Sequence, residues 1–404
     1  HHSCETALLR IQSDILQSLD KKKCCFLVLL DLFAAFDTVD HPILLKRLTD
    51  EYGITGNAHD WFCSYLTNRK HFVSIKGFHS KALTQHCNVP QGSVLGPTLF
   101  SDYTAALAEI FKKWNVSYHS YADDTQIYVH FTPGVDEHEA LERITNCLRE
   151  VRLWMAQHYL KLNDDKTDFI VFSSEYNKRK ITTTEITIGE SHVAPASKVT
   201  NIGSTLDSIL SMEEEVKAKC KAAWGNLYCL SKIRHYLTPE QLTAAIIAYV
   251  ISKLDQNNSL LHGIPAILLK KLQRIQNAAA RLIFRARKYD EALPLLFKLH
   301  WLPIAYRIDF KVMLLTYKAL HGEAPLYISN LLVPYKPERS LRSSDQNLLV
   351  EPRVSSKYGD RAFAACAPRL WNNLPSQIRD SSTTCAFKSK LKTLLFRKAF
   401  TQYL

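Results

Sequence analysis

The sequence lacks the features that mark several classes of protein. Its 404 residues contain no C-x-x-C pair and no Cys/His cluster at zinc spacing. The ten scattered cysteines are therefore expected to be reduced, mostly buried thiols of an intracellular protein, and not a disulfide framework. The longest mostly apolar run near the start, residues 24–36, is too short to span a bilayer and contains Asp31. We expect this run to be a buried strand and the protein to have no membrane segment.

The beginning of the chain also lacks familiar signals. The first residue is His1, and no signal peptide precedes it. We therefore expect the sequence to be a piece of a longer chain. A hydrophobic fraction of 46% and a charged fraction of 22% are ordinary for a folded globular protein, so disorder is not indicated.

The net charge of +12 is unevenly distributed. Residues 1–200 carry 21 Lys and Arg against 24 Asp and Glu, whereas residues 201–404 carry 30 against 15. A basic second half is typical of a polyanion partner, and a solvated basic surface that serves solubility is the alternative. The charge distribution alone does not decide between a polyanion partner and a solvated basic surface.

The pattern of the chain predicts an α+β fold. Residues 1–205 alternate strand-like and helix-like stretches, and a hairpin is expected around the SYADDTQIY segment. Helices are expected at 40–53, with Asp40 as N-cap and Pro42 in the first turn, at 95–114 and at 136–160. Strands are expected at 71–77 and 199–207. From about residue 210 the hydrophobic period is that of helices, whereas residues 331–360 are polar and contain three prolines. We expect residues 331–360 to be a linker or loop and residues 361–404 to form a C-terminal helical segment.

Carboxylates stand where strands are expected to end. Asp31 ends a buried apolar strand, and Asp123 and Asp124 fall at the expected hairpin tip. Neighbouring carboxylates repel each other, and Asp is also common in turns for its own hydrogen bonding. A carboxylate on a strand end beside two more at a hairpin tip would supply the oxygen ligands that Mg²⁺ favours when substrate phosphates complete its coordination. Two such ions can activate a hydroxyl and stabilise a leaving pyrophosphate.

Four ordered motifs carry a family resemblance. LLDLFAAFDTVDH, VPQGSVLGPTLF, YADD and LKLNDDKTDF, in this order, resemble the palm motifs of reverse transcriptases from non-LTR retrotransposons of the long interspersed element type. The likeness continues through QRIQNAAARLI and KLHWLPIAYRIDF and covers essentially the whole chain. The family's fingers segment and its upstream endonuclease have no counterpart in these residues, so the resemblance implies an N-terminally truncated polymerase.

The resemblance implies roles for individual residues. Asp31, Asp123 and Asp124 match the metal-binding aspartates. Phe36 matches the aromatic residue that blocks a ribose 2′-hydroxyl, although a core Phe is the alternative. Gln91 and Gly92 match the loop that positions the incoming nucleotide and the template base, although an ordinary turn is the alternative.

A lysine and a basic helix complete the expected site. Lys166 matches a lysine that donates a proton to pyrophosphate, and a solvated Lys is the alternative. Cations that could track a phosphate backbone, or form a solvated helix face, lie in the region that corresponds to the thumb and beyond. They are Lys270, Lys271, Arg274, Arg281, Arg285 and Arg287.

The resemblance also implies the architecture. Residues 1–205 are expected to form a palm, an antiparallel sheet with helices packed on one face and with the fingers missing. Residues 206–330 are expected to form a helical thumb and a basic helical region.

The expected function is RNA-directed DNA polymerisation, in which a primer 3′-hydroxyl attacks a deoxynucleotide across two Mg²⁺ ions, with Mn²⁺ as a possible substitute. The partners implied are an RNA template, a DNA primer or target and deoxynucleoside triphosphates, and the oligomeric state is left open. The parent element is expected to act in the nucleus at the integration site and in a cytoplasmic ribonucleoprotein. A catalytically silent remnant that only binds nucleic acid is the main alternative, and another palm-type polymerase or maturase is a third.

Overall fold

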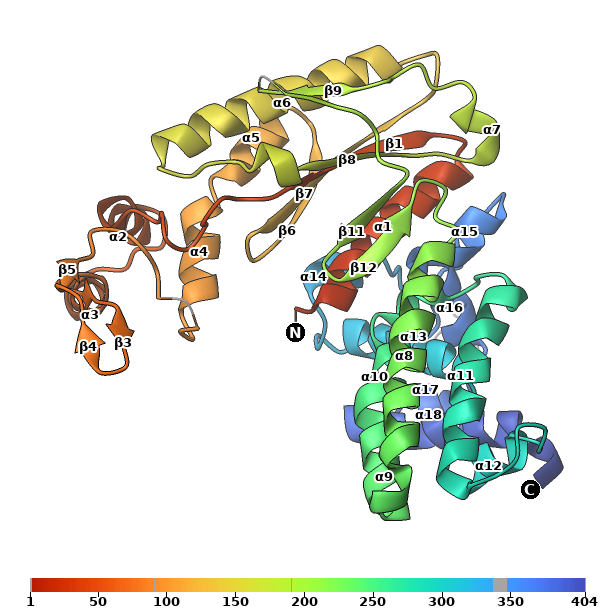
Figure 1. Cartoon of the computed structure of the whole chain (residues 1–404). Coiled ribbons are helices and arrows are strands. Elements are labelled where there is room, and N and C mark those ends of the chain that lie inside the picture. Colours follow the sequence, from red (N-terminus) through yellow and green to blue (C-terminus); the bar gives the residue numbers. More distant parts are fainter. Residues whose placement is uncertain (1, 91, 190, 337–346, 404) are drawn as a thin grey trace. The chain divides into compact units, whose positions relative to one another are not determined.

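The structure is a computed structural model that describes residues 2–90, 92–189, 191–336 and 347–403 (Figure 1). The chain folds into two compact units. Unit 2 is residues 24–197, and unit 1 combines residues 1–23 with residues 198–404. The predicted domain limits at 205, 330 and 360 remain predictions, because compactness defines units and not functional domains.

Unit 2 is built on a four-stranded antiparallel sheet with the strand order β6-β7-β1-β8. The strands are β1 (Cys24–Leu30), β6 (Ser117–Tyr121), β7 (Asp124–Phe131) and β8 (Asp168–Phe172). β1 forms the centre because CCFLVLL offers β-branched and apolar side chains to both neighbours, and six of its seven residues are buried. The antiparallel register of β1 with β7 pairs Cys24 with Phe131 at one end and Leu30 with Thr125 at the other.

Helices cover one face of this sheet. The long helix α6 (Glu137–Gln157) buries Ile144, Leu148, Val151 and Met155 in the same core as Phe26 and Val28 of β1, and α5 (Leu107–Lys113) packs beside it. Figure 1 shows α5 and α6 together along the sheet. The predicted α+β fold with an antiparallel sheet and packed helices is confirmed.

The segment between β1 and β6 holds short elements. α2 (His41–Asp50) begins as predicted, because the Asp40 side chain accepts a hydrogen bond from the Ile43 amide and Pro42 lies in the first turn. The other elements are α3 (Gly56–Leu66), β2 (Lys70–His71), β3 (Ser74–Ile75), β4 (Phe78–His79), β5 (Leu83–Thr84) and α4 (Gly96–Thr104).

The remaining elements of unit 2 lie at its C-terminal end. They are η1 (Asp164–Lys166), α7 (Glu175–Lys178), β9 (Ile186–Ile188) and β10 (Ser191–Val193).

Unit 1 is mostly helical. It consists of α1 (Cys4–Asp20), the hairpin of β11 (Lys198–Asn201) and β12 (Ser204–Asp207), α8 (Glu213–Ile233), η2 (Arg234–Tyr236), α9 (Pro239–Ile246), a π-helical turn η3 (Ile247–Ile251), α10 (Ser252–Asp255) and η4 (Asn258–Leu261). It continues with α11 (Ala266–Phe284), α12 (Leu293–Lys298), α13 (Ile304–Leu320), α14 (Leu326–Ser329), α15 (Lys357–Arg361), α16 (Phe363–Asn372), α17 (Ser376–Arg379), α18 (Thr384–Ala399) and η5 (Thr401–Tyr403).

Polar contacts join the N-terminal helix to the rest of unit 1. Glu5 accepts hydrogen bonds from the Ser259 amide and hydroxyl and pairs with Lys311 at 3.0 Å. Asp20 accepts hydrogen bonds from the amides of Ser355 and Ser356. Helix α1 was not predicted, although its apolar residues recur at helical spacing and Ser3 forms a capping box with Thr6. The contacts of Glu5 and Asp20 show that it belongs structurally to the helical unit.

Two sequence predictions need correction. None of the ten cysteines, all of which lie in the described residues, forms a disulfide bond, but only Cys24, Cys25, Cys147 and Cys366 are buried, so the expectation of mostly buried thiols is wrong. The helix expected across residues 95–114 is interrupted at Ala105 and Ala106, between α4 and α5. In the part of the chain that the structure describes, no helix combines the length and apolarity needed to cross a membrane.

Candidate functional site

The candidate site lies at one end of the sheet, where β1 stops and β7 starts. The last β1–β7 pair is Leu30 with Thr125. One step further along this antiparallel register places Asp31 opposite Asp124. The sheet therefore brings together carboxylates that are 93 positions apart in the sequence.

Asp123 belongs to a two-residue turn at the tip of the β6–β7 hairpin. Tyr121 pairs with Asp124, which leaves Ala122 and Asp123 as the two turn residues. Ala122 has φ +54, a left-handed conformation in which a Cβ atom is unfavourable. Such a conformation is common at the first position of a two-residue hairpin turn, where the surrounding structure enforces it. Here the enforcement comes from β7, which pairs on both sides and buries five consecutive residues after Asp124.

Asp124 lies close enough to the two other aspartates for their charges to act on it. Desolvation of its carboxyl group, followed by the negative charges of Asp123 and Asp31, raises the pKa of Asp124 above its ordinary value. A nearby like charge makes ionisation of a second carboxyl group more costly. The charges of Asp31 and Asp123 therefore contribute to the raised pKa of Asp124.

Asn163 holds Asp31 in place, and sequence reasoning missed it. Its side-chain amide donates a hydrogen bond to Asp31 Oδ2 at 3.1 Å, and its backbone amide donates to the Asp31 carbonyl at 2.9 Å. Leu162 also forms a bridge with Leu32. Asn163 lies in the LKLNDDK motif. Residue type alone, however, does not show that this amide, and not one of the two aspartates that follow it, contacts Asp31.

The other predicted residues are placed as follows. Lys166 is exposed in η1, and its amide donates to the Asn163 carbonyl at 3.2 Å. Phe36 is half-buried and packs on Phe100 with ring centroids 5.1 Å apart. The roles of Lys166 and Phe36 both remain predictions. An exposed lysine fits either a proton donor or a solvated side chain, and a half-buried ring fits either a core position or a contact with the sugar.

The loop before α4 contains Gly92. Gly92 has φ +78 and no atom within 4 Å of where a Cβ would lie. Glycine is therefore needed here for its backbone conformation, while the space beside it is open. Gln91 lies outside the described residues.

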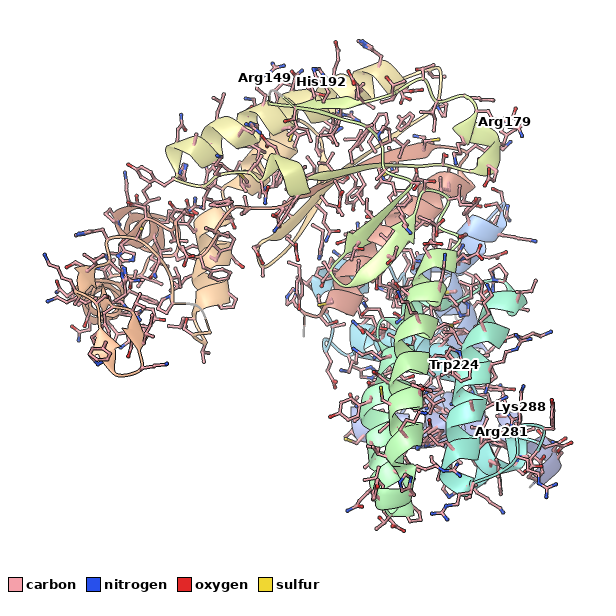
Figure 2. All side chains as sticks on the ribbon, in the orientation of Figure 1. Arg149, Arg179, His192, Trp224, Arg281 and Lys288 are labelled. Carbon is pink, nitrogen blue, oxygen red and sulfur yellow. The ribbon has the colours of Figure 1, made fainter. Side chains whose placement is uncertain are left out.

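The basic helix α11 presents only part of the predicted set on one face. Lys270, Arg274 and Arg281 fall within about 40° of one another at 100° per residue. Lys271 lies on another side and approaches Glu213 at 3.5 Å. Arg281 donates to the Asp290 carbonyl at 2.9 Å, and Figure 2 shows it near Lys288 at the C-terminal end of α11. Arg285 is exposed in the C-cap with φ +52, and Arg287 is exposed beyond it.

The carboxylates match the preferences of a divalent cation in donor type. Three hard oxygen donors with mutually repelling charge suit Mg²⁺ or a similar ion. Among the residues that the structure describes, however, no three His, Cys, Asp or Glu side chains are arranged so that they could hold a metal ion. Binding would therefore have to draw Asp31, Asp123 and Asp124 closer together. The residues present therefore fit a divalent cation in the chemistry of their donors.

An antiparallel sheet with helices on one face and carboxylates at the end of its central strands is the arrangement of a nucleic-acid polymerase palm. The family model for reverse transcriptase (RNA-dependent DNA polymerase) matches residues 2–206. The chain belongs to this family, whose members generally use divalent metal ions and bind RNA templates.

Curated relatives agree with this family. The chain is 26% identical over 295 residues to a probable RNA-directed DNA polymerase from transposon BS of Drosophila melanogaster, covering 70% of this chain and 31% of the relative. It is 29% identical over 178 residues to the RNA-directed DNA polymerase from mobile element jockey of Drosophila funebris, covering 43% and 19%. The chain thus spans about a third or less of these relatives. The predicted resemblance to non-LTR retrotransposon reverse transcriptases is confirmed.

Solved structures give a weaker likeness. Telomerase from Candida tropicalis aligns with a TM-score of 0.41 and 11% identity, over 100% of this chain and 55% of that one. Telomerase from Candida albicans, in complex with a fragment of telomeric RNA, aligns with a TM-score of 0.36 and 15% identity, over 77% and 52%.

Proposed function

We propose that the chain is the part of an RNA-directed DNA polymerase of a non-LTR retrotransposon that carries the polymerising carboxylates. The primer 3′-hydroxyl loses its proton to solvent and attacks the α-phosphate of a deoxynucleoside triphosphate. A new O–P bond forms while the bond between the α-phosphorus and the bridging oxygen breaks, and pyrophosphate leaves. The observation that supports this most directly is the β1–β7 register, which ends with Leu30 opposite Thr125 and so leads Asp31 toward Asp124, next to Asp123 in the hairpin turn.

The chain's own residues would contribute by holding the metal ions and by orienting one another. Asp31, Asp123 and Asp124 would hold divalent ions, two Mg²⁺ in the proposal, with Mn²⁺ able to replace them. When bound, such ions lower the pKa of the attacking hydroxyl and stabilise charge on the leaving oxygen. Asn163 would keep Asp31 oriented through its hydrogen bond to Oδ2. A carboxylate fixed in this way loses less conformational freedom when it binds a cation.

The substrates follow from the same proposal. The partners would be an RNA template, a DNA primer or target and deoxynucleoside triphosphates. Phe36 would exclude the ribose 2′-hydroxyl, Gln91 and Gly92 would position the incoming nucleotide, and Lys166 would protonate the leaving pyrophosphate. The parent element would work in the nucleus at its integration site and travel as a cytoplasmic ribonucleoprotein.

Primer extension on an RNA template tests the function. We expect the polymerase that contains this segment to extend a DNA primer in Mg²⁺, and Asp123→Asn to abolish extension while the fold is retained, because one metal ligand is lost at nearly constant volume. The matched control is Asp50→Asn, which removes an exposed carboxylate at the end of α2. Undiminished Mg²⁺-dependent extension by Asp123→Asn would refute the assignment, and RNA binding without any extension would support the silent-remnant alternative.

Phe36→Ala tests sugar selection separately. If the ring excludes the 2′-hydroxyl, the variant should incorporate ribonucleotides at a higher ratio to deoxynucleotides. A ring that only fills the core would instead cost about 3–5 kcal/mol of stability at an unchanged ratio. Incorporation ratio and melting temperature measured on one preparation distinguish these results.

A further inference from the structure

The segment between α3 and α4 has an unusual surface. Every residue from Lys70 to Thr84 is exposed. Within the described residues, β2 pairs only with β5, and β3 pairs only with β4 through a turn at Lys76 and Gly77, which have φ +48 and +85. Positive φ at both turn residues is the geometry of a tight two-residue hairpin. The backbone is thus regular although no side chain of the segment is buried.

Large apolar side chains occupy this exposed segment. Phe78 is 82% exposed, Ile75 65% and Phe72 53%, and Val73 and Leu83 are exposed as well. Figure 2 shows side chains extending from the β3–β4 ribbon. An isolated two-stranded hairpin is at best marginally stable in water, and contiguous exposed apolar side chains mark interaction sites. The hairpin therefore has the composition of a surface that a partner covers.

The charge of the segment identifies the kind of partner. Between Asp60 and Asp102 the sequence contains no acidic residue. The cations of this interval are Arg69, Lys70, Lys76 and Lys81. Within the described part of the chain none of the four takes part in an ion pair. A surface with cations alone complements a polyanion and repels a basic partner.

Aromatic rings continue the surface onto α3. Trp61 and Tyr65 stack with centroids 5.4 Å apart and planes at 8°, and the Arg69 guanidinium lies 5.7 Å from the Tyr65 centroid. Trp61 is 52% exposed, so one of these rings is open to solvent. Basic residues alternating with exposed aromatic rings are the features by which proteins hold single-stranded nucleic acid, because phosphates pair with cations and bases stack on rings.

We propose that residues 69–81, with Trp61 and Tyr65 of α3, form a binding surface for single-stranded RNA. We call it the hairpin surface. Bases stack on the exposed rings of Phe78 and Phe72, and Lys70, Lys76 and Lys81 neutralise phosphates. The inference rests on the proposed function in one respect, because a polymerase that copies RNA must hold an unpaired strand. Binding itself needs no catalysis.

Charge reversal tests the electrostatic part. The 404-residue chain is titrated against a fluorescently labelled oligouridine in EDTA, and anisotropy is followed at several salt concentrations. Lys70→Glu/Lys76→Glu/Lys81→Glu should lower the affinity about tenfold or more and flatten the slope of log K against log salt by about 2, since three phosphate contacts on a single strand are lost. The matched control, Lys388→Glu/Lys390→Glu/Lys392→Glu, reverses three exposed lysines of α18 and should keep the wild-type slope.

Phe78→Ala tests the stacking part. Loss of one stacked base should weaken binding by about 5- to 150-fold at an unchanged salt slope. The proposal is overturned if the hairpin triple variant binds like the α18 control, or if sedimentation shows dimers that Phe78→Ala dissociates, because the surface would then join two copies of the chain. A protein that binds RNA through the hairpin surface but never extends a primer would refute the proposed function and leave this inference standing.

Discussion

Two hairpins of unit 2 differ in what stabilises them. β6–β7 is part of the main sheet, and β7 is paired on both sides and buried from Thr125 to Val129. In the described part of the chain, β3 and β4 pair only with each other, and all their residues are exposed. A hairpin anchored in a core can carry a strained Ala122 and two repelling aspartates at its tip. A hairpin without a core can present apolar and basic side chains that a ligand completes.

The largest expected contrast is in stability. Phe131 of β7 is fully buried and stacks on Phe26 with centroids 4.0 Å apart. Phe131→Ala should lower the free energy of unfolding by about 3–5 kcal/mol, because it removes a core ring and leaves a cavity. Phe78→Ala makes the same chemical change at an exposed position and should stay within about 0.5 kcal/mol. Urea titration of both variants measures the contrast, and equal losses would show that the β3–β4 hairpin is packed in solution.

Hydrogen exchange should show the same difference residue by residue. Amides of β7 are expected to exchange only through large unfolding events, whereas amides of β3 and β4 should exchange roughly 100-fold faster or more, since they open locally. Oligouridine should slow exchange at β3 and β4 and leave β7 unchanged. Equal protection of the two hairpins in the RNA-free protein would contradict the claim that β6–β7 is anchored in a core and β3–β4 is not.

The smallest expected effect concerns charge at the β6–β7 tip. Because the pKa of Asp124 is raised in the folded state, the folded protein holds this proton more tightly than the unfolded chain does. Stability is then lost as pH rises from the ordinary carboxyl value through the raised one, and ionised Asp124 destabilises the fold at neutral pH. Asp124→Asn should increase the free energy of unfolding at pH 7 by about 0.5 kcal/mol and remove this part of the pH dependence.

Thermal or urea melts between about pH 4 and pH 7 check the charge effect. Asp50→Asn, at an exposed position, should change neither stability nor its pH dependence. A loss of stability in Asp124→Asn at pH 7 would mean that the carboxylate makes a stabilising contact.

Local patterns predict a large part of the fold. β1 follows from its continuous apolar run, α2 from Asp40 and Pro42, and α6 from its 3.6-residue period. The carboxylate cluster follows from motif order, and the register of β1 with β7 supplies the geometry that motifs cannot give.

Other parts depend on tertiary contacts. Nothing local interrupts residues 95–114, which contain no Gly or Pro after Pro97, yet the helix is broken at Ala105 and Ala106. The strand predicted at residues 71–77 is replaced by two short strands, β2 and β3, which pair with different partners, β5 and β4. The pattern VTNIGSTLD predicts a strand and forms the β11–β12 hairpin, with Ile202 and Gly203 at positive φ in the turn. The role of Asn163 depends on a partner 132 positions away.

Binding of Mn²⁺ tests the central claim most directly. In this account Asp31, Asp123 and Asp124 together hold a divalent cation at the end of the sheet. Electron paramagnetic resonance should show Mn²⁺ bound to the 404-residue chain, with affinity reduced about tenfold or more in Asp123→Asn and unchanged in Asp50→Asn. Mn²⁺ bound with equal affinity by wild type and Asp123→Asn would contradict the assignment of these carboxylates as the metal site.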